Sequence, residues 1–155
     1  MPLRRALGPV SLALALTLGA AMGVPAARAL EKPAGVDLTV VVTDLRSDQG
    51  KIKLALWRDA AGFTKPEAAV AKLTVEPLGK VARITIRDLP PGTYALASYH
   101  DENGNGKLDK TLIGWPDEGL GFSNGAWIKL GPPSFEDAAI TLGAGAGATV
   151  ISLRY

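Results

Sequence analysis

The sequence contains no cysteine and only one histidine, His100. Without cysteine there is no disulfide framework, and no thiol to carry a lipid at an export cleavage site. A zinc site would need carboxylates for every protein ligand other than this histidine. The folded protein is therefore expected to be held by its hydrophobic core, or by its core together with an ion.

The sequence also lacks an apolar run of the length that spans a bilayer, about 20 residues. A shorter run at 10–24 follows two arginines and precedes the small-residue site Ala27-Arg28-Ala29. This order is typical of a secretory signal peptide. We expect residues 1–29 to be cleaved during export, which makes the mature protein periplasmic or secreted. The alternative is that the segment stays as a membrane anchor.

There is little excess of charge of either sign. The whole chain has 17 basic and 15 acidic residues, but residues 1–29 contain three arginines and no acid. Residues 30–155 therefore carry 14 basic and 15 acidic residues, a net charge of −1. Nucleic-acid binding calls for clustered basic residues, so we expect no nucleic-acid partner.

Apolar and polar residues alternate with a period of two along much of the mature chain, as at 51–56, where Ile52, Leu54 and Leu56 alternate with Lys51, Lys53 and Ala55. Such alternation marks strands with one buried face. Seven segments show it, at 37–43, 51–56, 72–76, 81–87, 94–99, 138–142 and 148–154.

Short links rich in turn-forming residues separate several of these segments, at 47–50, 77–80, 88–92 and 143–147. One short helix is expected at 66–70, where proline begins the first turn. Seven short strands at regular spacing predict an all-β fold, a single antiparallel β-sandwich. We place it at 36–155, after a tether at 30–35. One long Gly- and Asn-rich loop, 101–137, interrupts the pattern, and such loops are often functional.

The segment 88–96, DLPPGTYAL, resembles a turn-and-strand signature of prealbumin-like sandwiches such as the B-type repeats of collagen-binding adhesins. Three further motifs follow in order: HDENGNGKLD at 100–109, GLGFSN at 119–124 and GPPSFEDA at 131–138. Together they resemble a bacterial exported family, domain of unknown function 2141, over 36–154. The resemblance implies a prealbumin-like β-sandwich and no particular activity.

Residues 101–109, within the HDENGNGKLD motif, have most of the spacing of a calcium-binding loop, with Asp101 at its first position. Oxygen-bearing side chains occupy its first, third, fifth and ninth positions, and glycine occupies the sixth. The seventh position contributes a backbone carbonyl, so a lysine is acceptable there. The candidate metal ligands are Asp101, Asn103, Asn105, Lys107 and Asp109.

The loop departs from this pattern at its twelfth position, where Leu112 stands in place of the usual glutamate. A site would need a further carboxylate, from Asp117 or Glu118. We expect Ca²⁺ to be the only cofactor and to bind weakly, with a Kd on the order of 0.1–1 mM. The alternative is a plain turn, because Asn and Gly accept left-handed backbone and Asx side chains bond to their own backbone.

His100 falls on the same strand face as Tyr94 and Leu96. It is either a hydrogen-bonded residue of the sandwich or a general base. The long loop also carries four aromatic residues, which either cap the sandwich as a second core or form a ligand-stacking surface. They are Trp115, Phe122, Trp127 and Phe135.

No nucleophile-elbow pattern or phosphate-binding loop is present, and no spacing selects a catalytic pair of carboxylates. The favoured hypothesis is a non-catalytic binding or accessory module, stabilised by calcium, that presents the 101–137 loop to a protein or carbohydrate of the cell envelope. The alternative is a hydrolase of envelope or extracellular material that uses His100 and loop carboxylates.

Overall fold

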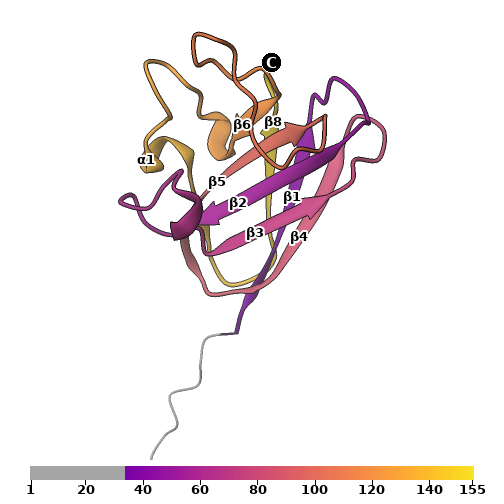
Figure 1. Cartoon of the computed structure of the whole chain (residues 1–155). Coiled ribbons are helices and arrows are strands. Elements are labelled where there is room, and N and C mark those ends of the chain that lie inside the picture. The colour runs from indigo at the N-terminus through magenta and orange to yellow at the C-terminus, as the bar shows by residue number, and fades with distance from the viewer. Residues whose placement is uncertain (1–33) are drawn as a thin grey trace, which may run out of the picture. The chain divides into compact units, whose positions relative to one another are not determined.

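Two β-sheets pack face to face in the computed structural model, which describes residues 34–155 (Figure 1). The predicted signal peptide and most of the predicted tether lie outside the described residues. Within residues 34–155, no helix has the length and apolar character needed to cross a membrane.

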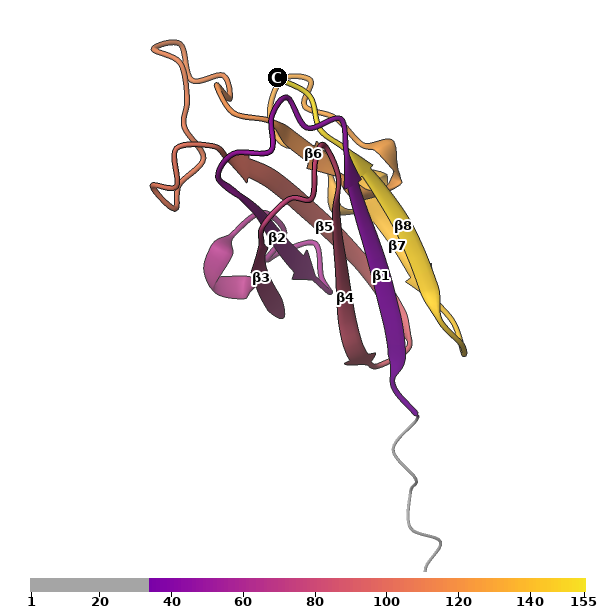
Figure 2. The ribbon, with the colours of Figure 1, turned by 90° about the vertical axis from the view of Figure 1, so that its right-hand side faces the viewer.

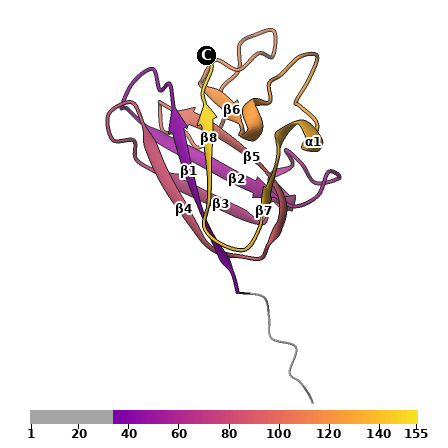
Figure 3. The same cartoon turned by 180° about the vertical axis from the view of Figure 1, so that it is seen from behind.

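The smaller sheet has three strands in the order β4-β1-β8. Strand β1 (Val36–Thr43) lies in the middle, antiparallel to β4 (Ala82–Leu89) and parallel to β8 (Gly147–Ser152). Figure 3 shows this sheet in front, with the other sheet behind it.

The larger sheet is built around β5 (Gly92–Asp101). Strand β2 (Lys51–Trp57) pairs with one edge of β5, and β3 (Ala71–Val75) pairs with β2. Two short strands share the other edge of β5, namely β6 (Leu120–Phe122) and β7 (Ala139–Leu142). Figure 2 shows β2 and β3 in one layer and β1 and β4 in the other.

The predicted all-β sandwich is confirmed, with each of the seven expected strands present. Two details differ. The β1–β8 pair is parallel instead of antiparallel, because residues 143–146 carry the chain from one sheet to the other instead of closing a hairpin. An eighth strand, β6, lies inside the segment expected to be one long loop. That segment also holds the short helices η2 (Ser123–Gly125) and α1 (Phe135–Ala138).

Alternate residues of the strands fill the space between the sheets. Leu54, Ile84, Ile86 and Leu96 are all buried there, as the period of two predicts. The hydroxyl of Tyr94 donates to the carbonyl oxygen of Pro90 at 2.6 Å and fastens the turn between β4 and β5.

A second cluster lies on the outer face of the larger sheet. Phe63 is at its centre, with its ring edge-on to Trp57, Phe122 and Phe135 at centroid distances of 5.4, 6.2 and 5.9 Å. Phe63 precedes η1 (Pro66–Ala68), a single 3₁₀ turn at the position of the expected helix. Of the four loop aromatics, Phe122 and Phe135 thus belong to a second core cluster, which covers the outer face of the larger sheet.

Candidate functional site

Strand β5 delivers His100 and Asp101 to the end of the larger sheet, where both side chains are buried. His100 lies on the inner face with Tyr94 and Leu96, as strand parity predicts. Asp101 is the last residue of the strand and begins the predicted calcium loop.

Both ring nitrogens of His100 are occupied. Nε2 lies 2.7 Å from the carbonyl oxygen of Gln49, which only accepts, so Nε2 carries the proton. Nδ1 lies 2.8 Å from the hydroxyl of Tyr155, which itself accepts from the backbone N–H of Arg46 at 2.9 Å. Since the side chain is fully buried and fully bonded, His100 has the position of a structural residue of the sandwich.

Arg46 also forms an ion pair with Glu102 beside this histidine. The hydroxyl of Ser47 donates to the same carboxylate at 2.6 Å. The hydrogen bonds from Arg46 and then Ser47 hold the pKa of Glu102 below its ordinary value of 4.5, although burial acts in the opposite direction. This charged network joins the loop after β1 to the end of β5.

Asp101 has an unusual environment for a carboxylate, because its side chain is only 1% exposed. Oδ2 accepts from the backbone N–H of Gly106 at 2.9 Å and lies 3.8 Å from Nζ of Lys53. Oδ1 is buried and has no hydrogen-bond partner among the described residues. A buried carboxylate oxygen without a partner is costly, so Oδ1 is the atom of this loop at which a cation would contribute most.

The other predicted ligands lie around Asp109. Nδ2 of Asn103 donates to Oδ2 of Asp109 at 2.6 Å, and Nδ2 of Asn105 donates to both oxygens at 3.0 and 2.9 Å. The amide oxygens of the two asparagines accept from backbone N–H groups two residues on, at Asn105 and Lys107. Three of the side chains that the calcium hypothesis requires, Asn103, Asn105 and Asp109, therefore meet, but in the pattern of self-bonded turns.

Glu118 joins the two ends of this loop. Its carboxylate accepts from the backbone N–H of Glu102 at 3.0 Å and from that of Asp109 at 3.1 Å. The side chain of Glu118 is buried, whereas that of Asp117 is exposed. Glu118 is buried because the chain returns against the end of β5 at 116–120.

A calcium site in this loop would need oxygen ligands other than carboxylates. No group of three or more His, Cys, Asp or Glu side chains in residues 34–155 lies together in a way that would hold a metal ion. The candidate set is therefore Asp101, Asp109, the amide oxygens of Asn103 and Asn105, and the carbonyl of Lys107, all oxygen donors of the kind that Ca²⁺ takes. The asparagine amides would have to turn to present their oxygens.

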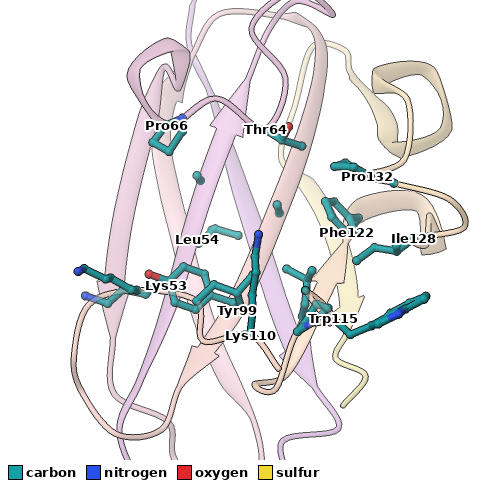
Figure 4. Close-up of a pocket in the computed structure, with 18 of the residues that line it drawn as sticks. Lys53, Leu54, Thr64, Pro66, Tyr99, Lys110, Trp115, Phe122, Ile128 and Pro132 are labelled. Atoms are coloured by element: carbon teal, nitrogen blue, oxygen red, sulfur yellow. The ribbon is translucent and has the colours of Figure 1, made fainter. Parts of the chain in front are cut away.

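A groove of about 1070 Å³ lies on the outer face of the larger sheet, beside the aromatic cluster (Figure 4). One wall comes from 106–116, which includes the end of the candidate calcium loop, and another from 128–132. Figure 4 shows Lys53, Tyr99 and Lys110 toward one end and Phe122, Ile128 and Pro132 along one side. The sequence did not reveal this groove, because its floor depends on how strands pair.

Comparison with known proteins gives one match. No curated protein and no solved structure matches the chain. A family model described as "Uncharacterized protein conserved in bacteria (DUF2141)" matches residues 40–150, which is most of the chain and nearly all of the sandwich. This confirms the resemblance drawn from the three motifs: the chain belongs to the DUF2141 family.

Proposed function

We propose that this protein is an exported, non-catalytic binding module that holds a ligand of the cell envelope in the groove on the outer face of its larger sheet. The observation that carries the proposal is the groove itself. Its volume of about 1070 Å³ is in the range of small-molecule sites, which are concave and mostly apolar. The 101–137 segment supplies much of its wall, in line with the expectation that this segment is presented to a partner.

Calcium is proposed to stabilise that wall. The unpartnered Oδ1 of Asp101 supports this, since a cation bound there would compensate a buried negative charge. The candidate ion loop also forms part of the groove, because its residues Gly106, Lys107 and Leu108 line it. Ordering the loop by an ion would therefore order one side of the binding site.

The hydrolase alternative is not favoured by the geometry. A general base must reach a proton of the substrate, and His100 is fully buried with both nitrogens engaged. The carboxylate of Glu118 faces two backbone N–H groups, which suits a structural role.

The test uses a neutral apolar fluorophore, N-phenyl-1-naphthylamine, whose emission rises in apolar surroundings. We expect saturable binding to the purified protein and its loss in Ala97→Trp, because Ala97 lies in the floor of the groove. The control is Thr85→Trp, on an exposed position of the smaller sheet. Absence of saturable binding to the unchanged protein, or equal binding by Ala97→Trp, would contradict the proposal.

A further inference from the structure

We propose that the groove binds an amphiphilic anion, a small molecule with one apolar chain or ring and one carboxylate, sulfate or phosphate head group. This inference rests on the proposed binding function and names the ligand class. It depends on three features: an apolar floor, exposed apolar side chains on the walls, and a one-sided distribution of charge.

The floor follows from the strand register of the larger sheet. One row across the sheet runs from Lys72 through Ala55 and Ala97 to Phe122, since these residues are cross-strand partners in β3, β2, β5 and β6. The next outward-facing row runs through Thr74, Lys53, Tyr99 and Leu120. All eight residues line the groove. The two alanines leave a hollow in the middle of the floor, with larger apolar residues on the β5–β6 side.

The walls carry apolar side chains that water surrounds. Ile113, Trp115 and Leu130 are exposed, and all three line the groove. Large apolar residues that gather around a concavity mark a binding site more often than isolated ones do. An apolar chain lying along the groove would cover them.

The charge around the groove has one sign. Five of the eight lysines in residues 34–155 line it, and none of the fourteen acidic residues does. The five lysines are Lys53, Lys72, Lys107, Lys110 and Lys129. Lys53 lies near Asp101, whereas the other four form no ion pair within residues 34–155. The overall balance of −1 concealed this cluster, because it averages over the whole surface.

The apolar surfaces and the five lysines of the groove together favour an amphiphilic ligand. A neutral sugar would gain little from five lysines, and a simple inorganic anion would gain little from the apolar floor. A flat membrane surface would not fill a concave groove between two loops. A single-chain molecule in solution satisfies both features, because its apolar part covers the alanines and larger apolar residues of the floor while its head group meets the lysines.

Three compounds with a ten-carbon chain and different head groups test this: decanoate, decyltrimethylammonium and decanol, each below its aggregation concentration. Titration calorimetry should show that decanoate binds and that decyltrimethylammonium does not. The double variant Lys72→Glu/Lys110→Glu should weaken decanoate binding by about tenfold or more, and added salt should weaken binding to the unchanged protein. Both lysines are exposed, so the fold should be retained, which a melting curve checks.

The matched control is Lys51→Glu/Lys80→Glu, which changes the net charge equally at exposed lysines outside the groove. It should bind decanoate like the unchanged protein. Equal binding of all three compounds would overturn the anion preference and leave the binding module standing. Binding of the neutral fluorophore without binding of decanoate would also overturn the anion preference and leave the binding module standing. Binding to anionic vesicles but not to free decanoate would also overturn the proposal.

Discussion

At the scale of single residues, Asp101 has the most demanding environment in the candidate site. Its side chain is 1% exposed, and one of its two oxygens has no hydrogen-bond partner among the described residues. Lys53 offsets the charge only from 3.8 Å and only at the other oxygen. A cation bound at this carboxylate would compensate its buried charge and so stabilise the fold.

We therefore predict that millimolar Ca²⁺ raises the melting temperature of the protein. At a calcium concentration ten times Kd, the free energy of unfolding should rise by about 1.4 kcal/mol. Asp101→Asn should lose this response, while Asp48→Asn, on an exposed residue outside 101–109, should keep it. A melting temperature that calcium does not change, together with unchanged amide resonances at 101–109, would establish the plain-turn alternative.

Glu102 gives a second residue-level prediction, on pH. Its pKa in the folded protein is lowered, mainly by Arg46. The stability that this shift contributes is therefore complete above the ordinary value of 4.5 and is lost as pH falls through the lower folded value. Glu102→Gln should be less stable than the unchanged protein near neutral pH, and the difference should shrink in acid.

Urea unfolding at several pH values measures this difference. Glu76→Gln, an exposed glutamate after β3, is the control and should show little difference at any pH. If the difference in the free energy of unfolding between Glu102→Gln and the unchanged protein stays constant down to about pH 3, the ion pair with Arg46 does not lower the pKa of Glu102.

At the scale of elements, β5 holds the larger sheet together, because it pairs with β2, β6 and β7. Leu96 lies in its middle and is fully buried in the core between the sheets. Leu96→Ala should lower the free energy of unfolding by about 2–5 kcal/mol. Thr93→Ala, at an exposed position of the same strand, should have little effect. Equal stability of both variants in chemical denaturation would mean that the assigned core face is wrong.

The motif at 119–124 is explained by the close packing of β6. A Cβ atom on Gly121 would lie 2.5 Å from the carbonyl oxygen of Ser152, and one on Gly119 would lie 2.4 Å from the ring of Tyr155. The hydroxyl of Ser123 accepts from the N–H of Leu96 at 2.9 Å. These contacts fasten β6 between β5 and the C-terminal strand.

Gly121→Ala should consequently destabilise the protein by about 1–3 kcal/mol, the usual cost of overpacking. Gly131→Ala is the matched control, since a Cβ atom there would meet nothing within 4 Å. Thermal unfolding of both variants compares them directly. A Gly121→Ala variant as stable as Gly131→Ala would show that β6 is not packed against β8 in this way.

At the scale of the whole molecule, the described sandwich begins well after the predicted cleavage site. Strand β1 starts at Val36, so removal of residues 1–29 would leave both sheets intact. We predict that protein recovered from the envelope or the medium begins at Leu30. N-terminal sequencing or intact mass measurement tests this, and an uncleaved chain in the membrane fraction would favour the retained-anchor alternative.

Local patterns in the sequence determined the strands, most of their buried faces and the spacing of the candidate ion loop. Side chains alternate across a strand with a period of two whatever its partner is, so the burial of Leu54 and Leu96 was predictable. The turns at Asn103 and Asn105 were equally predictable, because Asx side chains bond to the backbone two residues on.

The tertiary structure alone decided which strands pair, which loop residues are buried and where a ligand fits. The parallel β1–β8 pair depends on the crossing of the chain between the sheets at 143–146, and the short β6 depends on the return of the chain to the edge of β5; no local pattern encodes either. Glu118 is buried because the chain returns against β5, and the groove exists because Ala55 and Ala97 become neighbours in the strand register. Each of these contacts joins residues far apart in the chain, and their geometry exists only once the two sheets have packed together.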